Sequence, residues 1–435
     1  MQIIELYIDG FDNIINTKIT LSDLTALLSV NNYGKSNLLS AIKAGLTLPG
    51  LGKLAQRRFI NSTEHASINK KTYRNLKGLV KPFSFEVIFK GLLLNKAVTV
   101  KYGYSIKWKE GIETEFLRIS DNGSGGKQYL KRDNEITNYL STEHSRCDRR
   151  LTTDPYTLAI TTLSYFESRY NFHELPEMIC GITFPVFDTL DTENVFESIN
   201  MFYDTSDSSD LFSLSRTNTC KALFNLREIS TPTFQLIENT FITLFPQYTN
   251  IVVEKISSNS NIYDSEDEEH ILVSYIDDEY RVAFIDKYLI KPASAENLSN
   301  GTRRVLNILI FAAIAGIKSV PVIGIEEIET SIHPAKIGEF LDILTQLAPR
   351  SKFIVTSHSA SVAQYINAQA LYIGQPNQEG NARFLCLPNE SSKLLTKEAR
   401  QYGITIGEMI FNQLSNGATV EARLSSLLEV NYAKT

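Results

Sequence analysis

The sequence predicts an α/β fold in which short buried strands alternate with helices. An apolar strand at 24–28 runs through a polar loop into a helical segment at 35–45. Two further apolar stretches, 321–325 and 352–356, each follow a helix-like segment. Strands that are apolar along their whole length and alternate with helices are typical of a parallel sheet covered on both faces.

The composition excludes several classes of protein. The chain has 435 residues, with 43% hydrophobic and 21% charged residues and a formal net charge of −6. This length predicts two to three domains at about 150 residues each, and the composition is globular. Four scattered cysteines without a C-x-x-C pair argue against a disulfide framework or a zinc site. The sequence shows no signal peptide and no membrane span, so we expect a reduced, cytoplasmic protein with no membrane contact.

The remaining segments are assigned by their patterns. Alternating apolar and polar residues predict antiparallel strands near the N-terminus and at 83–89 and 97–108. We expect Gly45 to cap the C-terminal end of the predicted helix 35–45. Residues 130–250 show no heptad repeat, which argues against a coiled-coil arm. The acidic run 264–269 is interpreted as a solvated loop. The stretch 51–81 holds eight Lys and Arg residues against one acid, and is either a solvated surface loop or a nucleic-acid contact.

The first chemical motif is VNNYGKSN at residues 30–37. A strand that turns through Gly34 into a helix points backbone N–H groups and the helix dipole at one spot, which favours a bound phosphate. There Lys35 reaches the β- and γ-phosphates and Ser36 is a ligand of Mg²⁺. The Walker A pattern has a further glycine where this chain has Ser29. We therefore expect the start of the loop to be less free to adopt a positive φ.

The second motif is a pair of carboxylates, Glu326 and Glu327, directly after the buried strand 321–325. In a Walker B arrangement the first carboxylate supports Mg²⁺ and the second orients the attacking water. Glutamate at the first position reaches farther than aspartate, so we expect it to act on the metal through water. The alternative is an acidic loop that caps the following helix, where carboxylates are favoured.

Two more motifs complete the set. His358 follows the strand 352–356, where a histidine can donate to a γ-phosphate or be purely structural. Ser299 and Gly301, in LSNGTRR, open an apolar helix whose N-terminus is another anion site. A second site for the same nucleotide would duplicate the first, so we expect this one to serve the nucleotide of a partner subunit. Without a partner it is an ordinary capped helix.

In this order, the four motifs resemble those of the ABC-type, SMC-related ATPases of prokaryotes. These include the Septu PtuA, PARIS AriA and OLD-like ATPases of phage-defence loci. The resemblance covers residues 1–100 and 290–365 and implies an ABC/SMC-type P-loop ATPase head, a mixed sheet flanked by helices with an N-terminal antiparallel β subdomain. Residues 101–289 would then form an inserted mixed α/β middle domain, and residues 366–435 the C-terminal tail of the head.

The resemblance also implies cofactors and residue roles. ATP and Mg²⁺ would be sandwiched between two heads, with Glu327 as general base, His358 as switch histidine and Glu326 with Ser36 at the metal. Glu329 and His333 would make interface contacts, and Gln56 precedes the strand where a Q-loop glutamine would be sought. The residues implied to hold the nucleotide are Asn31, Asn32, Gly34, Lys35, Ser36 and Asn37 in one subunit and Ser299 and Gly301 across the dimer.

Departures from the family pattern reduce the number of candidate functions. Long heptad arms with a cysteine hook are absent, and the roughly 70 residues after His358 are short for the TOPRIM nuclease domain of OLD proteins. The leading hypothesis is therefore an ATPase, a homodimer or higher oligomer of dimers, that senses a trigger and gates a separate nuclease or toxin in anti-phage defence. One alternative is an SMC- or repair-like ATPase that acts on DNA itself, through 51–81. The other is a slowly hydrolysing nucleotide-gated scaffold, which Ser29 and Glu326 favour.

Overall fold

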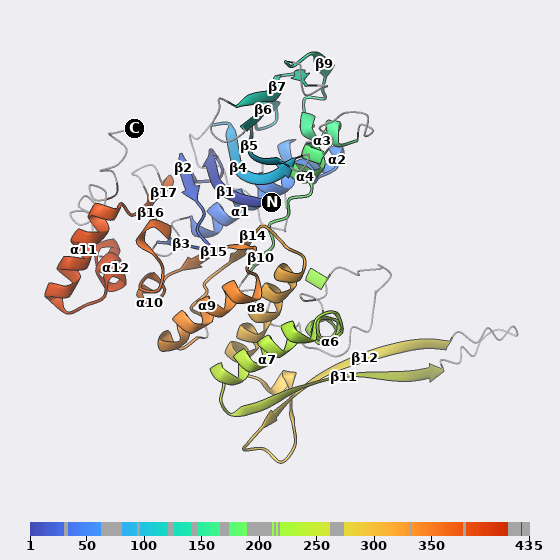
Figure 1. Ribbon diagram of the computed structural model, residues 1–435, viewed down its shortest axis with the longest axis vertical. Helices are drawn as coiled ribbons and strands as arrows, with labels where there is room; N and C mark the ends of the chain where they lie inside the picture. The colour runs from blue at the N-terminus through green and yellow to red at the C-terminus, as the bar shows by residue number, and fades with distance from the viewer. Residues whose placement is uncertain are drawn as a thin grey trace, which may run out of the picture. The chain divides into compact units, whose positions relative to one another are not determined.

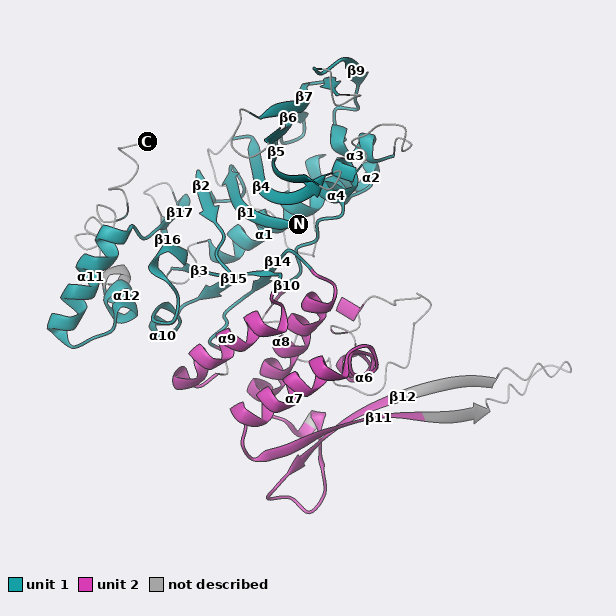
Figure 2. Ribbon diagram, viewed as in Figure 1, with its two compact units in different colours: residues 1–186, 320–329, 350–435 teal, residues 187–319, 330–349 magenta. Residues whose placement is uncertain are grey.

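The computed structural model describes residues 1–29, 34–61, 81–93, 96–120, 126–140, 146–165, 174–188, 211–212, 215, 218–261, 274–330, 332–376, 380–415 and 428. The chain forms two compact units (Figure 2). Unit 1 comprises residues 1–186, 320–329 and 350–435, and unit 2 comprises residues 187–319 and 330–349. Strand β5 (Lys96–Lys107) crosses the predicted boundary at residue 100. The predicted division into head and insert stays a prediction.

An eight-stranded antiparallel sheet forms the first part of unit 1 (Figure 1). Its order is β2-β1-β4-β5-β6-β7-β8-β9. The strands other than β5 are β1 (Gln2–Asp9), β2 (Thr17–Thr20), β4 (Phe83–Leu93), β6 (Gly111–Ser120), β7 (Lys127–Asp133), β8 (Ile136–Tyr139) and β9 (Arg149–Thr152). Alternate residues of β4 and β5, such as Phe85 and Tyr104, are buried. The sheet therefore has one core face and one polar face, and the predicted antiparallel β portion is confirmed.

A six-stranded mixed sheet, in the order β10-β14-β15-β3-β16-β17, holds the predicted buried strands. Its strands are β3 (Leu24–Leu28), β10 (Val186–Phe187), β14 (Val322–Ile325), β15 (Lys352–Ser357), β16 (Leu371–Pro376) and β17 (Ala382–Cys386). Strands β14, β15, β3 and β16 run parallel, and β17 is antiparallel to β16. The carboxyl ends of β3, β14 and β15 therefore meet at one edge of the sheet, which is where the predicted motifs begin.

The helix after β3 is α1 (Lys35–Thr47), and the prediction that Gly45 caps it is wrong. The helix continues through Thr47 and is followed by a 3₁₀ turn at Leu48–Gly50. Gly45 lies inside the helix, and a side chain would not fit there because a Cβ would come within 2.0 Å of the Phe85 ring. Its carbonyl also accepts a hydrogen bond from the Tyr104 hydroxyl at 2.9 Å. The glycine therefore allows α1 to approach the antiparallel sheet closely.

Three helices and a buried polar cluster lie against the core face of that sheet. The helices are α2 (Lys53–Asn61), α3 (Ala159–Ser164) and α4 (Glu174–Cys180). The Gln56 side chain is fully buried and donates to Leu51 O and Thr161 Oγ1, both at 2.8 Å. Its Oε1 accepts from the backbone N–H of Leu158 at 2.8 Å. Gln56 thus joins the start of α2 to the start of α3, and this structural role explains its burial without a nucleotide.

The C-terminal part of unit 1 is helical. It contains α10 (Ala360–Ala363), the 3₁₀ turn Ala368–Ala370, α11 (Asn389–Tyr402) and α12 (Ile406–Ser415). Helix α11 ends at Gly403, whose φ of +66° is the left-handed conformation common after helices. Strands β16 and β17 precede α11 and α12, so the C-terminal segment combines short strands with helices.

Unit 2 combines helices with a long hairpin of β11 and β12 (Figure 1). The elements are α6 (Thr219–Ile229), α7 (Thr231–Leu244), β11 (Tyr248–Asn261), β12 (Ser274–Asp286), β13 (Ala293–Ser294), α8 (Asn300–Ile317) and α9 (Ile337–Leu347). The predicted acidic loop 264–269 lies outside the described residues. Among the helices that the structure describes, none combines the length and the apolar character needed to cross a membrane.

Candidate active site

The predicted phosphate loop lies between β3 and α1. Gly34 occupies the N-cap position of α1 with φ +94°, and a Cβ there would come within 2.9 Å of Asn13 Oδ1. Asn13 Oδ1 also accepts a hydrogen bond from Asn37 Nδ2 at 2.9 Å, so the Asn37 side chain is engaged beside the helix start. Asn31 and Asn32 lie outside the described residues.

Ser29 occupies the last position before the loop and is fully buried. Ser29 is not among the non-glycine residues of the described chain that have a positive φ. The expectation that the start of the loop is less free to adopt one stays a prediction. At the position where the Walker A pattern has glycine, this chain therefore has a serine that adds a buried hydroxyl.

The Lys35 ammonium is the centre of a set of contacts at this edge of the sheet. Lys35 Nζ donates to Ser29 O at 2.9 Å and to Ser29 Oγ at 3.0 Å, and it lies 3.0 Å from His358 Nδ1. Lys35 is only 6% exposed. Burial lowers the pKa of Lys35 to about 8, although the nearby carboxylates of Glu329, Glu327 and Glu326 oppose this shift.

The two carboxylates of the second motif follow β14. Glu326 is buried, and Glu327 has a φ of +48°, which is uncommon for a residue with a side chain. Thr356 of the neighbouring strand holds this turn: its Oγ1 accepts from Glu327 N at 2.9 Å, and its carbonyl accepts from Ile328 N at 3.2 Å. The strained conformation is thus fixed by two hydrogen bonds from β15 to the backbone.

His358 connects the lysine to the carboxylates. Its Nε2 lies 3.6 Å from Glu327 Oε1, and its Nδ1 faces the Lys35 ammonium. If Lys35 donates, His358 Nδ1 is the acceptor, and the ring proton lies on Nε2, on the side of Glu327. The structure therefore brings together Ser29, Lys35, Glu327 and His358, which lie at the carboxyl ends of β3, β14 and β15 and at the start of α1.

Two contributions to this site were missed from the sequence. Glu329 Oε1 accepts from the backbone N–H of His358 at 2.6 Å, so Glu329 holds the turn after β15 within the same subunit. The sequence assignment of this residue to interface contacts did not foresee this hydrogen bond. Thr356, which fixes the Glu327 backbone, was also missed. The three glutamates among residues 326–329, directly after β14, were the signal available for Glu329, and nothing in the sequence marks Thr356.

The remaining predicted residues, Ser299, Gly301 and His333, belong to unit 2. Ser299 caps α8, and its Oγ accepts from Thr302 N at 3.1 Å; Gly301 lies in the first turn of this helix. His333 caps a short 3₁₀ turn, because its Nδ1 accepts from Ala335 N at 3.3 Å. The structure of one subunit thus shows a capped helix at the predicted second anion site. The role of that helix across a dimer stays a prediction.

The predicted metal ligands have suitable chemistry. Ser36 offers an exposed hydroxyl in the first turn of α1, and Glu326 offers a buried carboxylate after β14. Among the described residues no group of three or more His, Cys, Asp and Glu side chains could hold a metal ion alone. Mg²⁺ at nucleotide sites takes one or two protein oxygens and completes its shell with phosphates and water. The donor set therefore fits Mg²⁺ bound together with a nucleotide.

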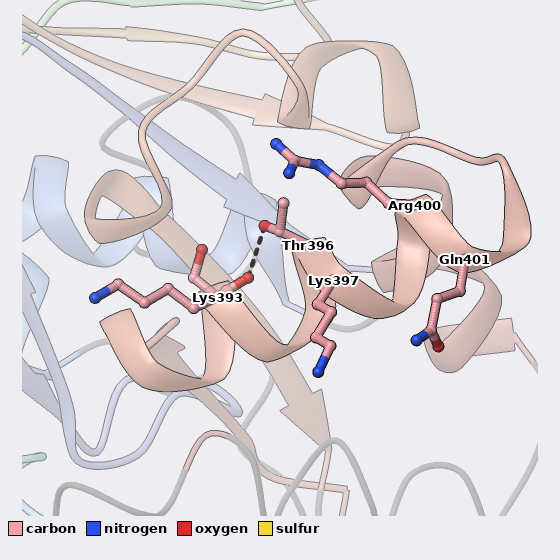
Figure 3. A pocket seen from close by; sticks show the side chains of 6 residues that line it. Lys393, Thr396, Lys397, Arg400 and Gln401 are labelled. Atoms are coloured by element: carbon pink, nitrogen blue, oxygen red, sulfur yellow. Dashed lines mark hydrogen bonds between the residues drawn. The ribbon is translucent and has the colours of Figure 1, made fainter.

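An open cavity of about 510 Å³ lies on helix α11 (Figure 3). Lys393, Lys397 and Arg400 line it together with Ser392, Thr396 and Gln401. The hydrogen bond in the figure is the helical one from Thr396 Oγ1 to Ser392 O, at 2.7 Å. None of these residues belongs to a predicted motif, and the lysines and the arginine are exposed.

Comparison with known proteins gives both sequence and structural similarities. The chain is 24% identical over 165 residues to the chromosome partition protein Smc of Chlorobaculum tepidum; the match covers 37% of this chain and 13% of that protein. An SmcHead solved with the C-winged helix domain of ScpA is 15% identical, with a TM-score of 0.47, and the match covers 90% of this chain and 100% of that one. The SMC head domain from Thermotoga maritima is 11% identical, with a TM-score of 0.40, at 89% and 100% coverage.

A protein-family model matches residues 30–363, from the phosphate loop to just beyond His358. It is described as "AAA domain, putative AbiEii toxin, Type IV TA system". The matched range contains all four motifs and most of the chain. The chain therefore belongs to this family of AAA-type ATPase domains.

Proposed function

We propose that the protein binds ATP with Mg²⁺ and hydrolyses it at the carboxyl edge of the six-stranded sheet. The observation that carries this proposal is the cluster of Lys35, Glu327 and His358, with Lys35 Nζ 3.0 Å from His358 Nδ1 and His358 Nε2 3.6 Å from Glu327 Oε1. A lysine at the start of a helix can bind the phosphates, a carboxylate beside it can orient the attacking water, and an imidazole can donate to the γ-phosphate.

Each residue has a distinct task in this proposal. The N–H groups at the start of α1 and the Lys35 ammonium bind the phosphates. Glu327 accepts a proton from the attacking water, and His358 Nε2–H donates to the γ-phosphate. Ser36 and Glu326 hold Mg²⁺, which neutralises phosphate charge when bound.

The direct test is nucleotide binding and turnover by the purified wild-type chain. We expect ATP to bind in the presence of Mg²⁺ and to be hydrolysed, and we expect EDTA to abolish turnover because the phosphate charge is then left unneutralised. Titration calorimetry and phosphate release measure the two quantities. A chain that shows no affinity for ATP with Mg²⁺ at any concentration would contradict the proposal.

We further propose that two subunits close on ATP and that the closed dimer gates a nuclease or toxin in anti-phage defence. Support comes from the N-terminus of α8, where the Ser299 hydroxyl accepts from Thr302 N and the helix dipole favours an anion, and from the resemblance of the motifs. The family's description names a toxin and a toxin–antitoxin system. A nuclease or toxin that co-purifies with the chain from its native host would identify the partner.

A second candidate function is binding of nucleic acid, which the polar face of the eight-stranded sheet favours. The strand register places Phe116 opposite Lys131, Lys131 opposite Asn138 and Asn138 opposite Arg150, so these side chains share one face. Arg118 lies on the same face, 5.7 Å from the centre of the Phe116 ring. Cations around an aromatic ring are typical of surfaces that contact phosphates and stacked bases.

Charge reversal on that face tests this second function. In the double variant Arg118→Glu, Lys131→Glu we expect the affinity for duplex DNA to fall about tenfold, and the salt slope of log K to drop by about 2, because two phosphate contacts are lost. Fluorescence anisotropy at several salt concentrations measures both. The matched control is Lys287→Glu, Lys291→Glu, two exposed lysines of unit 2. Equal losses in both double variants, or no DNA binding by the wild type, would argue against this surface.

A further inference from the structure

The turn between β12 and β13 exposes a group of large apolar side chains, and it projects away from the helices of unit 2 (Figure 2). Tyr288 and Leu289 are 77% and 56% exposed, and Ile290 is fully exposed. With Ile285, four of the thirteen exposed large hydrophobic residues in the described chain lie within six positions. Single exposed apolar residues are normal, whereas such a group marks a contact surface. We call Tyr288, Leu289 and Ile290 the apolar turn.

Hydrogen bonds hold the apolar turn in this exposed position. Asp286 Oδ1 accepts from Tyr288 N at 2.8 Å, and Asp286 O accepts from Leu289 N at 3.2 Å. Lys287 ties the turn to the segment before β11, because its Nζ donates to Pro246 O at 3.0 Å. The turn is therefore ordered before it meets any partner, and little conformational entropy is lost when it binds.

Positive charge flanks the apolar turn on both sides. Lys287 precedes it, Lys291 follows it, and both side chains are exposed. Lys287 Nζ lies 5.1 Å from the centre of the Tyr288 ring, so this charge stands beside the ring. An anionic membrane has the matching order of layers: phosphates bind lysines, the interface favours tyrosine, and the acyl chains accept aliphatic side chains.

We propose that the apolar turn inserts into the surface of a membrane that contains anionic lipids, with Lys287 and Lys291 at the headgroups. A second copy of the chain fits the turn less well, because contact between two such turns would bring their lysines together. No membrane contact was expected from the sequence, which shows no membrane span, but a turn that enters only the interface needs no span. Membrane contact by this turn does not depend on the ATPase proposed above.

The test measures binding to vesicles of phosphatidylcholine with about 30% phosphatidylserine, and to vesicles of phosphatidylcholine alone, by flotation at several lipid concentrations. We expect the wild type to bind the anionic vesicles. The double variant Leu289→Ser, Ile290→Ser should bind them about 100-fold more weakly, since each buried aliphatic side chain contributes roughly tenfold. Lys291→Gln should bind the anionic vesicles about fivefold more weakly and the neutral vesicles like the wild type.

The matched control is the double variant Leu54→Ser, Leu92→Ser, which removes two exposed leucines of unit 1. We expect it to bind both kinds of vesicle like the wild type. Tyr288→Trp reports insertion directly, because the chain has one other tryptophan, Trp108. Its emission should shift to the blue on addition of anionic vesicles, as the indole leaves water, and the emission of the wild type should not shift.

Three results would overturn the proposal. The first is equal binding of anionic vesicles by the wild type and by Leu289→Ser, Ile290→Ser, and the second is no binding of either kind of vesicle by the wild type. The third is a wild type that is dimeric without lipid while Leu289→Ser, Ile290→Ser is monomeric, because the apolar turn would then bind a second copy of the chain.

Discussion

Replacing Glu327 by glutamine is expected to lower ATP turnover by about 10²- to 10³-fold while ATP binding stays within about threefold of the wild type. Glutamine has the shape of glutamate and no basic oxygen, so the attacking water loses its proton acceptor. Thr356 holds residue 327 at its φ of +48° by accepting hydrogen bonds from the backbone N–H groups of residues 327 and 328, and the substitution does not change these groups. The variant should therefore keep the geometry of the site and lose its chemistry.

Because the variant binds and does not hydrolyse, it should also accumulate the ATP-bound form. If two subunits close on ATP, light scattering of Glu327→Gln with ATP and Mg²⁺ should give the mass of a dimer, and the apo form that of a monomer. Phosphate release measures the loss of turnover on the same samples. The control is Glu113→Gln, a glutamate that pairs with Lys107 at 2.8 Å on the antiparallel sheet. Turnover by Glu327→Gln equal to that of the wild type would remove Glu327 from the mechanism.

The sequence was sufficient to predict the parts of the fold that depend on continuous burial. The stretches 24–28, 321–325 and 352–356 became β3, β14 and β15, because strands buried on both faces need apolar residues along their whole length. The position of Gly34 followed from the same logic, since a strand that turns into a phosphate-binding helix needs a residue that tolerates a positive φ. These predictions rest on local chemistry alone.

Features that depend on long-range packing could not be predicted. Gly45 fits a helix cap as well as a close contact, and only the position of Phe85 decides between the two. The contacts of Lys35 with Ser29 and His358 require β3 and β15 to pair in register, with Leu28 opposite Ser357. No local pattern in the sequence specifies that register. For the same reason the hydrogen bond of Glu329 to the His358 backbone was not foreseen.

Replacing Lys35 by methionine is expected to weaken ATP binding about 100-fold, because the phosphates lose a buried cationic partner. Methionine keeps most of the packing of the lysine stem, so little is lost besides the charge. Burial lowers the pKa of Lys35 to about 8 despite three nearby carboxylates, which means that folding disfavours the ammonium relative to water. The substitution relieves this cost but also removes the hydrogen-bond donor that faces Ser29 and His358, so we expect the free energy of unfolding without nucleotide to change little in Lys35→Met.

Lys352→Met is the matched control, since Lys352 is also nearly buried and its Nζ pairs with Asp23 Oδ1 at 2.7 Å. It lies at the amino end of β15, whereas His358 follows the carboxyl end. We expect this variant to bind ATP like the wild type and to lose some stability with the ion pair. Calorimetric titration and urea unfolding separate the two effects. A Lys35→Met variant that loses stability and keeps its ATP affinity would make Lys35 a structural residue, and the phosphates would then have to be bound elsewhere.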